Sequence, residues 1–283
     1  MKMVNEKIGH HATYWDGKSM VDSWSNTWEH TLPEIKPYPY MHIKDNLFGM
    51  PWLTGDAIKF KMDIQFIQRN IMPILLREVQ YTFSGEVGHI VQGSPILLIR
   101  TQGCNMECPW CDAQGSQDFE HGLSVDHRVL AELMYNSAFP ILLTGGEPLL
   151  HSKAILEALC LLDNIYNVRR TVQIETNGSI AIDPELLTYA TFVVDYKFQY
   201  QHQMKRENYD LLTNKDWIKL LVTDQDDILK LKQFIEDFPI DTKAKLAVSC
   251  TDNQLYKEVC DLVLDNKWPI IVNVQIHKLL GIA

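Results

Sequence analysis

The feature that most constrains the fold is a repeated alternation of apolar, strand-like runs with amphipathic, helix-like segments, which starts at Val79. Such alternation is typical of an α/β domain with a mainly parallel sheet covered by helices. The number of repeats predicts a partial or modified (β/α) barrel. We expect strands near residues 80–83, 95–100, 141–144, 171–175, 192–196, 217–222, 245–249 and 270–274. We expect helices near residues 126–137, 152–165, 184–189, 226–238 and 253–265.

Residues 1–78 differ in composition and are predicted to form an irregular, partly helical N-terminal extension ahead of a barrel domain at residues 79–283. They contain four of the seven tryptophans and a proline-rich stretch at residues 32–40. One helix is predicted near residues 56–70, because the apolar residues there share one helical face. The extension could cover the barrel, form an oligomer interface, dock a partner or cap the substrate, and the sequence leaves these roles open.

The net charge of −10 is unevenly distributed. Residues 1–78 hold nine basic and nine acidic residues, so residues 79–283 carry the whole excess. An acidic domain repels phosphate backbones, which argues against a nucleic-acid partner. No apolar run reaches transmembrane length and the N-terminus lacks a signal-peptide pattern, so we expect no membrane partner. Cys160, Cys250 and Cys260 stand singly in apolar segments, which favours a reducing cytoplasm.

Unusual polar sequences follow four successive predicted strands. They are the cysteine-bearing loop at residues 103–112, TGGEP at residues 144–148, ETNG at residues 175–178 and DYK at residues 195–197. Because catalytic groups of parallel barrels gather at the carboxyl ends of the strands, these sequences are predicted to share one site.

The cysteine loop holds Cys104, Cys108 and Cys111 in the spacing C-x3-C-x2-C. Three close thiolates are too many for one disulfide and one short of an all-cysteine zinc site. They suit a [4Fe–4S] cluster, which normally takes four cysteine ligands, with one iron left open for another ligand. A zinc knuckle that takes a distant histidine as its fourth ligand is the alternative.

This spacing, with Trp110 before the third cysteine and the Gly-Gly-Glu at residues 145–147, resembles the radical S-adenosylmethionine (SAM) enzymes. In those enzymes the open iron chelates the amino acid end of SAM. The resemblance implies SAM contacts from three groups that follow β-like runs, and from one serine later in the chain. These residues are Gly146, Glu147, Glu175, Asn177, Asp195, Lys197 and Ser249. An ordinary Gly-Gly or Asn-Gly turn and a solvated lysine are the structural alternatives.

Within that superfamily, residues 80–283 resemble the 7-carboxy-7-deazaguanine synthases. The resemblance is carried by FSGE at residues 83–86, IRTQGC at 99–104, QIETNG at 173–178 and QIHKLLGIA at 275–283. It implies a lyase of queuosine biosynthesis that converts 6-carboxy-5,6,7,8-tetrahydropterin into 7-carboxy-7-deazaguanine and ammonia. It also implies a [4Fe–4S] cluster, SAM, Mg2+, a flavodoxin-type reductant and a possible homodimer.

The family likeness implies a set of substrate contacts. Glu86 can accept two neighbouring pterin N–H groups, and Arg100 can pair with the substrate carboxylate in a bidentate way. The other residues of this set are Ser84, Gly85, Thr144, Gln275, His277 and the terminal Ala283. Ala113 stands where the family has a Thr or Ser ligand to Mg2+. A methyl group cannot coordinate a hard cation, so magnesium binding at this position is in question.

Two further hypotheses stay open at the level of sequence. A glycyl-radical activating enzyme shares the cysteine and Gly-Gly-Glu motifs, and residues 1–78 could dock its protein partner. A non-catalytic interaction protein whose cysteines hold zinc would explain the missing magnesium ligand.

Overall fold

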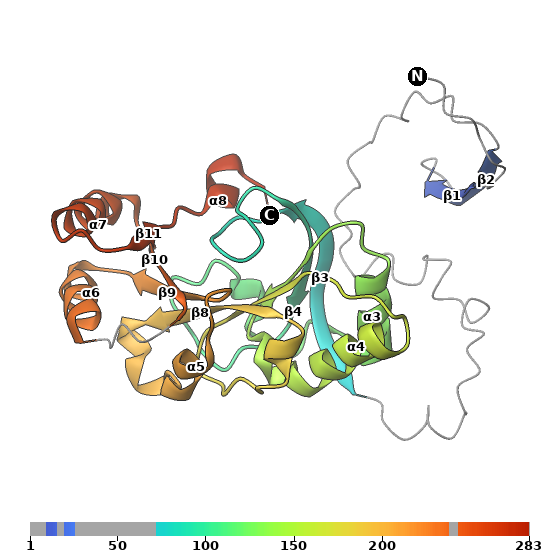
Figure 1. Ribbon diagram of the computed structural model, residues 1–283, viewed down its shortest axis with the longest axis horizontal. Coiled ribbons are helices and arrows are strands. Elements are labelled where there is room, and N and C mark those ends of the chain that lie inside the picture. Colours follow the sequence, from blue (N-terminus) through green and yellow to red (C-terminus); the bar gives the residue numbers. More distant parts are fainter. Residues whose placement is uncertain (1–9, 16–19, 26–71, 238–242, 283) are drawn as a thin grey trace. The chain divides into compact units, whose positions relative to one another are not determined.

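The computed structural model describes residues 10–15, 20–25, 72–237 and 243–282 (Figure 1). The chain divides into two compact units, the first with residues 1–40 and 45–61 and the second with residues 41–44 and 62–283. In the first unit β1 (His10–Trp15) pairs antiparallel with β2 (Met20–Ser25). The helix expected near residues 56–70 lies outside the described residues, and the domain boundary at residue 78 stays a prediction.

The second unit is built on one nine-stranded sheet in the order β11-β10-β9-β8-β7-β6-β4-β3-β5. Strand β4 and strands β6 to β11 run parallel, whereas β3 pairs antiparallel with both β4 and β5. The α/β fold and the partial barrel are therefore confirmed. The strands are β3 (Pro73–Phe83), β4 (Pro95–Thr101), β5 (Leu123–Asp126), β6 (Ile141–Gly145), β7 (Val172–Thr176), β8 (Thr191–Lys197), β9 (Trp217–Val222), β10 (Lys245–Cys250) and β11 (Ile270–Val272).

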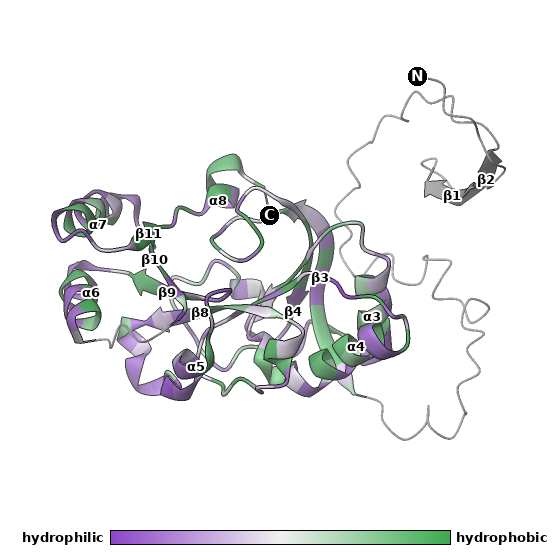
Figure 2. Ribbon diagram, in the orientation of Figure 1, coloured by the Kyte–Doolittle hydropathy of each residue, from purple (hydrophilic) through white to green (hydrophobic). Residues whose placement is uncertain are grey.

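Helices cover this sheet: α6 contacts β9, α7 contacts β10 and β11, and α4 contacts β3 (Figure 1). Figure 2 shows mixed hydrophobic and hydrophilic stripes on α4, α6 and α7, as expected of helices with one face on a sheet. Asp126 and Asp252 cap α3 and α7 through their side chains. The helices are α3 (His127–Tyr135), α4 (Ser152–Asn164), α5 (Arg206–Leu211), α6 (Gln225–Asp237), α7 (Asn253–Asp265) and α8 (Ile276–Leu280).

The expected helix at residues 184–189 is wrong in type, because the structure has only the 3-10 turn Leu186–Thr188 there. Strand β3 begins at Pro73, seven residues before the expected start at Gln80. Within the described residues, no helix is both long and apolar enough to cross a bilayer.

The segment between β3 and β4, residues 84–94, folds onto the inward face of the sheet. Its Val87 clusters with Val193, Trp217 and Ala247, and its Ile90 clusters with side chains of β4 and β6. Side chains two residues apart on a strand share a face. The segment therefore packs on the same face as Asp195, Lys219 and Ser249, and it carries Glu86 to the ends of the strands.

Candidate active site

The three cysteines of the loop after β4 are free thiols. The loop is fixed by backbone hydrogen bonds from Gly103 N to Ser116 O (2.8 Å) and from Cys104 N to Gln117 O (3.0 Å). Gly103 has a φ of +94°, which favours glycine. Burial raises the pKa of all three thiols and brings that of Cys108 to about 11, so a bound metal must supply the positive charge that stabilises the thiolates.

The donor set fits an iron–sulfur cluster better than a single zinc ion. Ligand atoms around one zinc ion lie within about 4 Å of one another, given Zn–S bonds of about 2.3 Å. In the part of the chain that the structure describes, the group whose ligand atoms converge within 4.8 Å is Glu86, Asp112 and His277, and the cysteines form no such group. Soft cysteine thiolates are the ligands that an iron–sulfur cluster takes.

The glycine pair after β6 packs against the cysteine loop. Gly145 has a φ of +136°, and Gly146 N donates to Thr101 O at 3.1 Å. A Cβ at Gly146 would come within 2.1 Å of Gly103 O. Only glycine allows so close an approach of two backbones, so this pair sets the position of the cysteine loop.

Glu147 is fully buried, and both of its carboxylate oxygens accept hydrogen bonds from the protein. Oε1 accepts from Leu149 N at 2.9 Å and from Thr176 Oγ1 at 2.7 Å, and Oε2 accepts from Asn177 N at 2.7 Å. This arrangement joins the ends of β6 and β7. Glu147 is therefore placed to support neighbouring groups, and the direct contact with SAM that the sequence indicated stays a prediction.

Asn177 connects the end of β7 to the cysteine loop. Its Nδ2 donates to Asn105 Oδ1 at 3.1 Å and lies 3.8 Å from Cys104 Sγ. Its Oδ1 accepts from Ser179 N and Ser179 Oγ at 2.9 and 2.6 Å. Asn177 is thus buried and directed towards the first cysteine.

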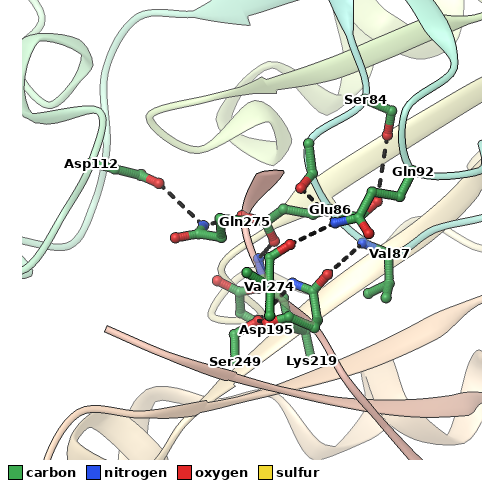
Figure 3. Close-up of polar contacts among 12 residues, drawn as sticks. Ser84, Glu86, Val87, Gln92, Asp112, Asp195, Lys219, Ser249, Val274 and Gln275 are labelled. Carbon is green, nitrogen blue, oxygen red and sulfur yellow. Dashed lines mark hydrogen bonds and ion pairs between the residues drawn. The ribbon is translucent and has the colours of Figure 1, made fainter. Parts of the chain in front are cut away.

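Four charged side chains of alternating sign form what we call the ionic cluster: Glu86, Lys219, Asp195 and Lys197 (Figure 3 draws the first three). Lys219 Nζ contacts Glu86 Oε2 and lies 3.1 Å from Asp195 Oδ1, and Lys197 Nζ contacts Asp195 Oδ2. Asp195 and Lys219 are direct partners in the pairing of β8 with β9. The cluster extends towards the cysteines, since the charge of Lys197 acts on the thiols of Cys108 and Cys111.

The alternation of charges sets the ionisation of this cluster. Burial works to raise the pKa of Asp195, but Lys197 and Lys219 outweigh it and the net shift is downward. Burial works to lower the pKa of Lys219, but Asp195, Glu86 and Glu175 raise it. Burial, and then the charge of Glu86, raise the pKa of Glu175 to about 7. Glu175 therefore differs from its neighbours in being readily protonated.

Lys219 was missed by sequence analysis. It stands within the apolar run WIKLLV of β9 and is only 7% exposed. A lysine at an inward-facing position of an otherwise buried strand was the available signal, because lysine is rarely buried unless it is paired.

The C-terminal segment reaches the same region. Gln275 Nε2 donates to Glu86 Oε1 and lies 3.4 Å from Asp112 Oδ2 (Figure 3). Lys278 Nζ lies 3.3 Å from Asp112 Oδ2 and donates to Gln275 Oε1. His277 packs so closely on Gly85 that a Cβ there would lie 1.9 Å from His277 Nδ1.

Arg100 and Thr144 are neighbours across β4 and β6. Arg100 Nε donates to Glu78 Oε1 at 2.6 Å. A guanidinium bonded through Nε can still present its two terminal amines to a second carboxylate. The charge of Arg100 also acts on Cys111 and Asp112, which places it near the cysteine loop.

Two other sequence-predicted residues have internal partners, and one is not described. Ser84 is buried and closes the base of its loop through Ser84 N to Ser94 O at 2.8 Å. Ser249 accepts from Asn273 Nδ2 at 2.7 Å, and Asn273 Oδ1 in turn accepts from Val87 N. Ala283 lies outside the described residues.

The residues present do not fit magnesium at the expected position. Ala113 offers no oxygen from its side chain, and the nearby carboxylates of Glu86 and Asp112 already pair with the ammonium groups of Lys219 and Lys278. His277 lies beside them, and its imidazole is at most a neutral ligand that brings no negative charge. A hard divalent cation needs anionic oxygens that are not already neutralised.

Comparisons with known proteins agree with this geometry. Residues 92–218 match the family model described as a 4Fe-4S single cluster domain. The 7-carboxy-7-deazaguanine synthase of Clostridium acetobutylicum is 32% identical over 197 residues, which cover 66% of this chain and 88% of that protein. The synthase of Methanospirillum hungatei is 27% identical over 208 residues, which cover 73% and 85%.

The crystal structure of QueE from Escherichia coli superposes with a TM-score of 0.57 at 19% identity, and covers 75% of this chain and 98% of that one. That likeness shows the fold. The extent and level of the sequence match show the family: the chain belongs to the 7-carboxy-7-deazaguanine synthases.

Proposed function

We propose that the protein is a radical SAM lyase that converts 6-carboxy-5,6,7,8-tetrahydropterin into 7-carboxy-7-deazaguanine and ammonia. Family membership supports this activity. The observation that carries it is the ionic cluster, which links Glu86 to Asp195 and Lys197 at the ends of neighbouring strands beside the cysteine loop. In this proposal the cluster joins the residues of the substrate side to those of the SAM side.

Cys104, Cys108 and Cys111 would hold the [4Fe–4S] cluster, and Asn177 and the backbone N–H of Met106 would donate to the sulfur of Cys104. When bound, the cluster and SAM supply a 5′-deoxyadenosyl radical that takes a hydrogen atom from C6 of the substrate. The electron that starts the reaction would come from a flavodoxin-type reductant. The protein's own task is to orient both molecules and exclude water.

The substrate side of the site would be formed by Glu86 and Arg100. Glu86 is buried and pairs with Lys219, and a carboxylate in this position can accept neighbouring N–H groups of the pterin. Arg100, held through Nε by Glu78, would bind the substrate carboxylate. This side would be completed by Gln275, His277, Thr144 and the Ser84-Gly85 backbone. Ala283 lies outside the described residues and stays a predicted substrate contact.

The SAM side would be formed by Gly146, Asn177, Asp195 and Lys197. Glu147 would act through Asn177, whose backbone it fixes, and Ser249 would act through Asn273. Glu175, partly buried beside Glu86 and Asp195, would lie between the two sides. Magnesium takes no part in the proposed reaction. The proposed enzyme is a homodimer.

Anaerobic reconstitution with iron and sulfide, followed by incubation with SAM, dithionite and the tetrahydropterin, tests the proposal. We expect 7-carboxy-7-deazaguanine and ammonia in equal amounts, measured by chromatography with mass detection. SAM cleavage without the deazaguanine would reject the substrate and keep the class of enzyme. Absence of both from protein that carries its iron would reject the proposed function.

A further inference from the structure

Lys219 occupies the middle of the ionic cluster. It is 7% exposed and lies on β9 next to Asp195 of β8. Its ammonium contacts two carboxylates, Glu86 Oε2 on the loop after β3 and Asp195 Oδ1 at 3.1 Å. Lys219 therefore contacts both Glu86, which is proposed to bind the substrate, and Asp195, which is proposed to bind SAM.

Loss of Lys219 would remove a positive charge from among several carboxyl groups. Without it, the carboxyls of Glu86, Asp195 and Glu175 would be left together with Lys197 as the remaining close cation. Glu86 would lose the ammonium that contacts its Oε2. Its carboxylate could then turn away from the pterin N–H groups that it would accept.

A purely structural role explains these contacts poorly. Replacing a whole buried charged pair by apolar groups is often neutral or stabilising, whereas removal of one partner alone is destabilising. Stability alone therefore gives weak reason for a charged pair among apolar strand residues such as Ile218 and Leu220, which are fully buried.

We propose that Lys219 is a positioning residue for the reaction, which pairs with Glu86 and holds it in register with Asp195, so that substrate and SAM are aligned with each other. This inference rests on the proposed function. Lys219 acts through Glu86 and Asp195 and need not touch either molecule. Its loss is expected to weaken substrate binding and to separate radical formation from product formation.

Three variants test this: Lys219→Met, Lys219→Arg as the charge-conserving variant, and Lys232→Met as a control at an exposed lysine of α6. For Lys219→Met we expect the KM for the tetrahydropterin to rise about tenfold to a hundredfold, as for loss of a charged hydrogen-bonding partner. We also expect the ratio of 5′-deoxyadenosine to 7-carboxy-7-deazaguanine to rise. Iron content should stay at the wild-type level, and Lys219→Arg should recover part of the KM and of the ratio.

Several results would overturn the inference while the proposed function stands. In the first, the wild-type enzyme makes the deazaguanine and the Lys219→Met variant has the same KM and the same product ratio as the wild type. Another is an equal loss in Lys219→Met and Lys219→Arg together with a lower iron content, which would indicate a structural role. Lack of product from the wild type would reject the proposed function itself and this inference with it.

Discussion

The carboxylate of Glu147, at the end of β6, accepts a 2.7 Å hydrogen bond from the backbone N–H of Asn177, at the end of β7. Because Asn177 lies against Cys104, this one contact connects the Gly-Gly-Glu sequence to the cysteine loop through the neighbouring strand. The motif therefore supports the metal site through the backbone, in addition to any contact it makes with a ligand.

Glu147→Gln should lower both stability and iron loading. The amide offers one oxygen acceptor and places N–H donors opposite the donors of Leu149, Thr176 or Asn177, which costs about 1–3 kcal/mol for a buried group. Urea unfolding of the iron-free protein measures the first effect, and iron content after reconstitution measures the second. Glu157→Gln, at an exposed position of α4, is the control, and equal stability of the two variants would contradict the assigned role.

Cys108→Ala should abolish iron loading and SAM cleavage together, because a cluster with one open iron needs all three cysteines. The wild type should carry about four irons per chain and show the brown colour of a [4Fe–4S] cluster. Cys160→Ala, a cysteine of α4 outside the loop, should keep both properties. Retained iron and retained cleavage in Cys108→Ala would mean that the ligands are assigned incorrectly.

Magnesium should be dispensable for this chain. Ala113 supplies no ligand atom, and Lys278 already pairs with Asp112. We expect the rate of product formation in magnesium-free buffer to stay within about twofold of the rate with added Mg2+. If the reaction needed a bound Mg2+, its removal would lower the rate by about tenfold or more. Ala113→Thr should introduce a response to Mg2+. A wild-type enzyme that is inactive until Mg2+ is added, with its iron content constant, would show that the metal binds elsewhere.

Glu175 should make stability depend on pH. Its pKa is raised to about 7 in the folded protein, first by burial and then by Glu86, whereas an unfolded glutamate titrates near 4.3. The folded state then binds more protons between these values, so this group's contribution to stability falls as pH rises from about 4.3 to about 7. Glu175→Gln should therefore gain stability relative to the wild type as pH rises through this window.

Thermal unfolding at a series of pH values measures this difference in Tm. Glu207→Gln, at an exposed position of α5, should show a difference in Tm that is flat with pH. A flat difference for Glu175→Gln as well would mean that Glu175 is already ionised throughout, with Lys219 outweighing its burial.

Much of the fold could be predicted because local pattern determined it. All eight expected strands correspond to observed strands, since each is a short apolar run bounded by polar residues. Strand β5, with four residues of mixed burial, has too little pattern to be recognised. The segment at residues 184–189 was expected to be a helix, yet the structure has only the 3-10 turn Leu186–Thr188 there, in which Leu186 is buried.

The site was predicted less completely, because its decisive contacts are distant in sequence. Lys219 meets Glu86 across 133 positions of the chain, and no local motif announces that pair. The expected contacts of Glu147 and Ser249 with SAM stay predictions. The structure adds protein partners for both residues that only the folded arrangement of β6, β7 and β10 provides. Motifs predict which residues gather, and folding determines which of them remain available to a ligand.

The most direct measurement for the whole account follows a single hydrogen atom. The reconstituted enzyme is given tetrahydropterin that carries deuterium at C6, and SAM and 5′-deoxyadenosine are then examined by mass spectrometry. The account predicts deuterium at the 5′ carbon of these molecules alongside formation of 7-carboxy-7-deazaguanine. Product that forms with no transfer of deuterium, or SAM cleavage that never yields the deazaguanine, would contradict it.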